Sequence, residues 1–181
     1  AEELQGAKAA LGWPLEPPFY IPEDVLKYFR KAINRGKKRE KLWRENMQSM
    51  AAKKPEHVAE FNRVMRGELP ADWETAFSPF PDGSKDVATR KASETVMQAI
   101  AARLPELTGG SADLNPSTFT WLKGRGDFQS PAASADGLHG MVGGGWSYSG
   151  RNIHFGVREH AMGCVAVGMA LHGGFIPYTA T

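Results

Sequence analysis

The sequence predicts an α/β protein in which a helical region is followed by a region with a parallel sheet. Apolar residues in the first third recur at helical spacing. Residues 68–86 are rich in proline and turn-forming residues, and beyond them short apolar stretches alternate with helical segments. This alternation favours parallel strands covered on both faces. The proline-rich stretch marks the boundary between two domains, 1–80 and 81–181.

The first 67 residues are expected to be helical apart from an extended, proline-rich connection over residues 13–18. A short helix around Leu4 should end at Gly12, and the acidic residues after Pro22 should open a helix that Gly36 ends. A further helix carries Trp43, and another should follow Pro55 and end at Gly67. Their apolar side chains are predicted to face a core: Val25, Phe29, Ile33, Trp43, Met47, Met50, Val58, Phe61 and Met65.

The second domain should alternate helices with short strands. The predicted elements are a helix over Val87–Leu104 with Val96 and Ile100 inward, strands over Leu107–Gly110, Asn152–Phe155 and Phe175–Thr179, and a helix over Val157–His172. The last helix is dense in small residues, which indicates close approach either to a second subunit or to a neighbouring helix of this chain. Cys164 on this helix is expected to be a small core residue.

Charge and composition exclude several classes of protein. The net charge of +2 is too small to imply a polyanionic partner. One basic cluster is interrupted by Glu40 and Glu45, so we interpret it as a solvated helix face rather than a nucleic-acid footprint: Arg35, Lys37, Lys38, Arg39, Lys41 and Arg44. No apolar run is long enough to span a membrane, the first residues lack the features of a secretory signal, and the single cysteine is compatible with the cytoplasm.

Three motifs carry the chemistry. They are Ala88–Thr95 (ATRKASET), Gly109–Ser117 (GGSADLNPS) and Gly156–Met162 (GVREHAM). The last two follow apolar strands at glycine-containing turns, where an α/β fold exposes catalytic groups. In these three motifs the chain resembles the transketolase family of thiamine diphosphate enzymes. The resemblance implies a middle segment that covers the end of the diphosphate-binding domain and the start of the pyrimidine-binding domain.

The resemblance also implies the roles of four residues. Glu159 would hydrogen-bond the pyrimidine ring of the cofactor and exchange a proton with it. Asp113 would lie near the cofactor; a turn aspartate bonded to its own backbone is the alternative. Arg90 and Ser117 would bind the phosphate of the sugar substrate, since an arginine fork and a hydroxyl donor suit a dianion. No metal ligand is expected among residues 1–181, because the family's Mg²⁺ or Ca²⁺ site precedes this region.

By the same resemblance, the chain would serve two-carbon ketol transfer between ketose and aldose phosphates, a step of the pentose phosphate pathway. Its expected partners are sugar phosphates and the remaining transketolase segments, in a homodimer or a split-chain assembly, with no nucleic acid and no membrane. Alone it should be inactive. Two alternatives remain: a related synthase that makes dihydroxyacetone or deoxyxylulose phosphate, and a non-catalytic segment that binds a partner. The glycine-rich loop over residues 132–150 is expected to be mobile.

Overall fold

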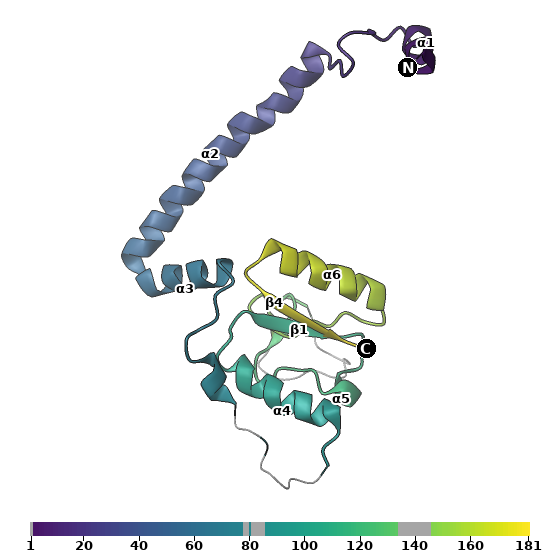
Figure 1. Cartoon of the computed structure of the whole chain (residues 1–181). Helices are drawn as coiled ribbons and strands as arrows, with labels where there is room; N and C mark the ends of the chain where they lie inside the picture. The colour runs from purple at the N-terminus through teal and green to yellow at the C-terminus, as the bar shows by residue number, and fades with distance from the viewer. Residues whose placement is uncertain (1, 78–79, 81–85, 134–145) are drawn as a thin grey trace. The chain divides into compact units, whose positions relative to one another are not determined.

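A computed structural model describes residues 2–77, 80, 86–133 and 146–181. The chain divides into two compact units, Ala1–Val58 and Ala59–Thr181. The first unit holds helices α1 (Glu2–Ala10) and α2 (Glu23–Lys53), and helix α3 (Pro55–Met65) extends from the first unit into the second. The helical region followed by parallel strands that the sequence predicts is confirmed (Figure 1).

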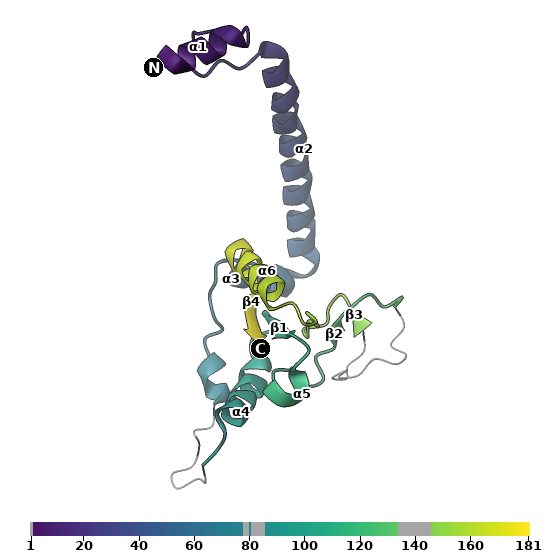
Figure 2. The same cartoon turned by 90° about the vertical axis from the view of Figure 1, so that its right-hand side faces the viewer.

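Helix α2 is one continuous helix, so the predicted end at Gly36 is wrong (Figure 2). An interior glycine costs about 1 kcal/mol relative to alanine, which a helix of 31 residues can absorb. Ion pairs between residues four apart line its surface and offset part of this cost. These pairs are Lys27–Glu23, Lys41–Glu45 and Arg44–Glu40, and the last two belong to the predicted solvated basic face.

The prediction that the apolar stripes of these helices face a core is wrong for the described chain. Phe29 is 69% exposed and Trp43 is 52% exposed, and no described residue of α1, α2 or α3 is buried. Periodicity identifies an apolar face, but it does not tell what covers that face. The stripes are therefore surfaces in this chain.

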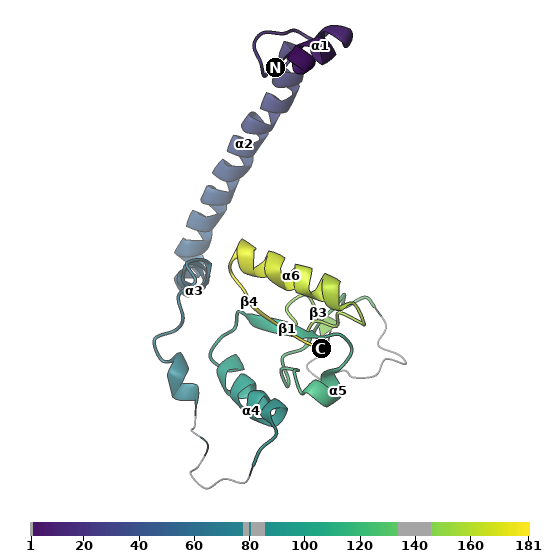
Figure 3. The same cartoon turned by 45° about the vertical axis from the view of Figure 1, so that its right-hand side comes forward.

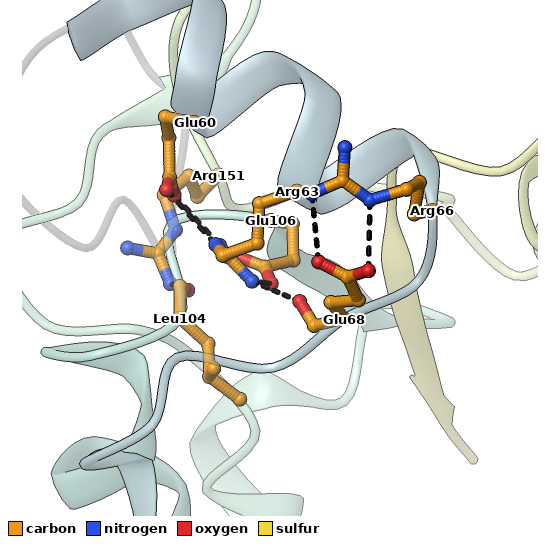
Figure 4. A network of polar contacts seen from close by, with 7 residues as sticks. All are labelled: Glu60, Arg63, Arg66, Glu68, Leu104, Glu106 and Arg151. Carbon is orange, nitrogen blue, oxygen red and sulfur yellow. Dashed lines mark hydrogen bonds and ion pairs between the residues drawn. The ribbon is translucent and has the colours of Figure 1, made fainter.

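Helix α3 ends at the predicted place. Gly67 adopts a φ of 70°, and its amide donates to the carbonyl of Val64. Near this end Arg63 donates to the carboxylates of Glu60 and Glu106 and to the carbonyl of Glu68 (Figure 4). The side chains of Arg63 and Glu106 are only 14% and 4% exposed, so this buried pair fastens the end of α3 to the residue before the first strand.

The second unit is built on two parallel strands, β1 (Leu107–Ser111) and β4 (Ile176–Ala180). Helix α4 (Thr89–Ala101) covers one face of this pair and helix α6 (Glu159–His172) covers the other (Figures 1 and 3). The remaining elements are a 3₁₀ turn η1 (Trp73–Ala76), the short helix α5 (Asn115–Thr118) and a second parallel pair, β2 (Asp127–Phe128) with β3 (Trp146–Ser147). A Cβ on Gly109 would lie 2.0 Å from the carbonyl oxygen of Tyr178, so only glycine fits there.

The core differs from the prediction in two places. Met97 and Ala101 are the buried apolar residues of α4, whereas Val96 and Ile100 are partly buried, although Ile100 packs against the core as predicted. No strand forms over Asn152–Phe155: Asn152 makes only isolated bridges. Its buried side chain instead bonds the amide and carbonyl of Leu122 and the carbonyl of Gly126. Asn152 therefore organises a loop.

Helix α6 also departs from its prediction. Cys164 is exposed rather than a core residue, and its Sγ lies 3.8 Å from Nε2 of His160. Met162 is the buried residue of this helix. Within the described part of the chain, none of the helices has both the length and the apolar character that a membrane crossing requires.

Helices α4 and α6 each precede a strand of the parallel pair and run back against it. Their N-terminal ends therefore lie at the carboxyl ends of β1 and β4, together with α5 (Figures 1 and 3). In open α/β sheets this edge is where ligands bind. The three motifs identified in the sequence meet at this edge.

Candidate functional site

A surface pocket of about 490 Å³ opens at the carboxyl edge of the β1–β4 pair. It lies between the N-terminus of α4, the short helix α5 and the end of β4. Hydroxyl groups dominate its polar lining. The lining residues are Thr89, Arg90, Ser93, Leu114, Ser117, Thr118, Thr120, Ala180 and Thr181. Arg90 and Ser117, predicted from two separate motifs, thus share one pocket.

Arg90 is the second residue of α4 and is exposed to solvent. Among the described residues no carboxylate lies within 4.0 Å of its guanidinium, so its charge is not neutralised within the described chain. The backbone amides of the first turn of α4 add partial positive charge beside it. An arginine next to a helix N-terminus is well suited to a phosphate dianion.

The neighbouring Lys91 is held differently. Its Nζ lies 3.4 Å from the centroid of the Phe119 ring and 3.0 Å from a carboxylate oxygen of Glu94. Glu94 is 8% exposed and also pairs with Lys123 at 2.8 Å. The hydrogen bonds from Lys123 and Lys91 hold the pKa of Glu94 below its ordinary value of 4.5. Because Lys91 is paired with this carboxylate, Arg90 is, among the described residues that line the pocket, the cation available to a ligand.

Ser117 lies in the short helix α5, where its Oγ donates to the carbonyl of Leu114 at 3.0 Å. That carbonyl already accepts from the backbone amides of Ser117 and Thr118, each at 2.9 Å. A carbonyl oxygen has two lone pairs, so the two amides satisfy it. The hydroxyl of Ser117 can therefore turn to a ligand oxygen without leaving the Leu114 carbonyl unpaired.

Asp113 and Glu159 lie at the same edge of the sheet but outside the lining of this pocket. Asp113 follows β1 by two residues, has a φ of 64° and is exposed. Among the described residues its carboxylate has no hydrogen bond, so the alternative of a turn bond to its own backbone is not seen. Glu159 begins α6, two residues after the predicted start at Val157, and is also exposed, close to the turn at Gly156 with its φ of 69°.

Sequence reasoning missed the hydroxyls of Thr118 and Thr120, and the buried amide of Asn115 behind them. The available signal was the pair of threonines, Thr118 and Thr120, directly after the GGSADLNPS motif. Among the described residues no group of three His, Cys, Asp or Glu side chains is arranged to hold a metal ion. Residues 134–145 of the predicted glycine-rich loop lie outside the described residues.

Two protein-family models match this chain. The family "Transketolase, pyrimidine binding domain" matches residues 85–181, which contain all four predicted site residues. The chain belongs to the transketolase family. "Transketolase, thiamine diphosphate binding domain" matches residues 1–70 of the same transketolase chain. The predicted boundary at 80/81 stays a prediction, because these matches leave residues 71–84 unassigned.

Individual transketolases align along nearly the whole chain. The transketolase of Nostoc is 44% identical over 99% of this chain, and that of Geobacillus stearothermophilus is 39% identical over all of it. A crystal structure of Pichia stipitis transketolase in complex with sedoheptulose 7-phosphate superposes with a TM-score of 0.81 at 36% identity, over 99% of this chain. The chain spans 25% of the length of each of these three proteins.

Proposed function

We propose that this chain is the middle segment of a cytoplasmic transketolase, which transfers a two-carbon ketol unit from ketose phosphates to aldose phosphates in the pentose phosphate pathway. The observation that carries this proposal is the pocket shared by Arg90 and Ser117 at the carboxyl edge of the sheet. Transketolases of 36% identity have been crystallised with sugar phosphates, including xylulose 5-phosphate and sedoheptulose 7-phosphate. We infer that the pocket receives the phosphate end of such a substrate.

The chemistry of the pocket supports a phosphate ligand. The guanidinium of Arg90 supplies a positive charge that no described carboxylate neutralises, and the first turn of α4 adds backbone donors. Ser117 supplies a hydroxyl proton, because its present acceptor, the carbonyl of Leu114, also accepts hydrogen bonds from two backbone amides. A dianion would thus meet both charge and directed donors. An unphosphorylated sugar would gain much less from the same groups.

The residues at the edge also fit thiamine diphosphate. Glu159 presents an exposed carboxylate at the start of α6, and Val157, which is 73% exposed, offers an apolar surface two residues away. A carboxyl group beside an apolar surface suits the hydrogen-bonding edge and the flat face of a pyrimidine ring. When bound, the cofactor supplies the nucleophilic carbon that adds to the donor ketone. Glu159 would hold and exchange a proton at the pyrimidine nitrogen, and Asp113 would lie close to the ring.

The rest of the site would come from outside this chain. We propose that Mg²⁺ or Ca²⁺ and its ligands belong to the remaining transketolase segments, and that the working protein is a homodimer or a split-chain assembly. Three apolar side chains of α6 support a partner surface: Val165, Val167 and Leu171 are 45%, 60% and 83% exposed. An apolar surface of this kind is typical of an interface. The single cysteine is compatible with the proposed cytoplasmic location.

The proposal is tested in the complete transketolase that contains this segment. Arg90→Ala should raise KM for a ketose phosphate by about 10- to 100-fold, because a charge-assisted hydrogen bond contributes about 1.5–3 kcal/mol. KM for the same ketose without phosphate should change little. The matched control is Arg103→Ala, which removes an arginine paired with Asp72 just beyond the other end of α4. An equal effect of Arg90→Ala on both substrates would refute phosphate binding in this pocket.

A further inference from the structure

One buried asparagine ties the wall of the pocket to the end of strand β1. Asn115 is 5% exposed, and its Oδ1 accepts a hydrogen bond from Oγ of Ser111 at 2.9 Å. The same Oδ1 accepts from Oγ1 of Thr120 at 3.2 Å. Ser111 is the last residue of β1 and is 1% exposed, whereas Thr120 lines the pocket. Asn115 thus connects the sheet to a wall that contains Ser117, Thr118 and Thr120.

The hydroxyl next in line extends this connection. Oγ1 of Thr118 lies 2.8 Å from Oγ1 of Thr120. A hydroxyl has one proton to donate, and Thr120 gives its proton to Asn115, so a hydrogen bond between the two threonines uses the proton of Thr118. Thr118 has a second acceptor in reach, the Leu114 carbonyl, but backbone amides already satisfy that oxygen. The oxygen of Asn115 therefore sets the direction of the hydrogen bonds from Thr118 through Thr120.

We propose that Asn115 is a positioning residue for the phosphate end of the substrate, because its side-chain oxygen holds the hydroxyl-bearing wall of the pocket in a fixed place relative to strand β1. This inference rests on the proposed function of the pocket. Asn115 itself is not among the residues that line the pocket. It acts through Thr120 and Thr118, and through the turn that carries Ser117.

The backbone of the turn does not depend on the asparagine side chain. The amides of Ser117 and Thr118 donate to the carbonyl of Leu114, and the amide of Phe119 donates to the main-chain carbonyl of Asn115. These bonds persist when the side chain is shortened to alanine. Phe119, however, holds a φ of 56°, a conformation that non-glycine residues rarely adopt. Removing the side-chain bonds should therefore loosen residues 117–120 without unfolding the domain.

The test uses Asn115→Ala, Thr120→Val and the double variant in the complete transketolase. Asn115→Ala should raise KM for a ketose phosphate by about two- to tenfold and change KM for the unphosphorylated ketose much less. The double variant should be no worse than the more affected single variant, because both remove the same hydrogen bond. Amide hydrogen exchange at residues 117–119 should become faster in Asn115→Ala. Thr120→Val keeps the side-chain shape and serves if Asn115→Ala does not fold.

The matched control is Asn152→Ala, which removes a buried asparagine that bonds Leu122 and Gly126 and does not line the pocket. It should lower the melting temperature without a phosphate-selective change in KM. Equal effects of Asn115→Ala on both substrates, or multiplying effects in the double variant, would overturn the inference. Failure of the proposed function is distinguishable, because in that case Arg90→Ala would also lack a phosphate-selective effect.

Discussion

Replacing Glu159 by glutamine separates its proposed chemical role from its structural role. Glu159 is the first residue of α6 and is exposed, so its contribution to folding is limited to its interaction with the helix dipole. That interaction is about 0.3–1 kcal/mol for an exposed carboxylate. The amide of glutamine keeps the size and one acceptor, but it cannot exchange a proton with a ring nitrogen. We expect kcat to fall by about 10²- to 10⁴-fold, which is typical of losing a general acid–base group.

The assay compares kcat and the melting temperature of the complete enzyme with and without Glu159→Gln. The matched control is Glu23→Gln, which removes an exposed carboxylate from the first turn of α2 and loses a comparable dipole interaction. Both variants should melt within a few degrees of the parent, and only Glu159→Gln should lose turnover. Near-normal turnover in Glu159→Gln would refute the proposed role. An equal loss in Glu23→Gln would show that the effect is structural.

Three further predictions concern stability. Gly109→Ala should destabilise the protein by about 2–4 kcal/mol, because its Cβ would lie 2.0 Å from the Tyr178 carbonyl oxygen. Gly36→Ala, where a Cβ meets open space, should raise the melting temperature slightly. Equal melting temperatures of the two variants would contradict the close approach of Gly109 to Tyr178. Glu106→Gln should cost about 3 kcal/mol because it breaks a buried pair with Arg63, and Glu68→Gln, in an exposed pair with Arg66, should leave the urea midpoint unchanged. Since Lys123 and Lys91 hold the pKa of Glu94 below 4.5, the stabilisation of the fold by this carboxylate should be complete above about pH 5 and be lost as the pH falls through the lowered pKa. The difference in urea midpoint between the parent and Glu94→Gln should therefore shrink on acidification. A constant difference would argue against these ion pairs.

Helices α4 and α6 and strands β1 and β4 could be predicted from sequence because their apolar patterns are clearly bounded, whereas α5, β2 and β3 are too short to leave such a pattern. Strand β1 was predicted to within one residue, and α6 within two. Glycine was a less reliable signal. Gly67 ends α3 because its backbone turns left-handed with a φ of 70°, whereas Gly36 lies inside α2. Composition alone cannot distinguish these two cases, since both glycines follow a helical pattern.

The candidate site was only partly visible in the sequence. Arg90 and Ser117 could be named because they belong to motifs, and the structure brings them into one pocket. Asn115 could not be assigned a role, because its bond to Thr120 spans Phe119, whose left-handed backbone is not evident from the sequence. The exposure of the apolar faces of α2 and α6 could not be predicted either, because an apolar face does not identify what covers it.

The most direct test of the proposed site is a crystal structure of the complete transketolase with thiamine diphosphate and a ketose phosphate bound. We predict that Arg90 and Ser117 lie about 3 Å from phosphate oxygens, and that the carboxylate of Glu159 lies within the same distance of the pyrimidine nitrogen. A phosphate bound away from Arg90, or a pyrimidine ring out of hydrogen-bonding reach of Glu159, would contradict the assignment of the carboxyl edge as the active site.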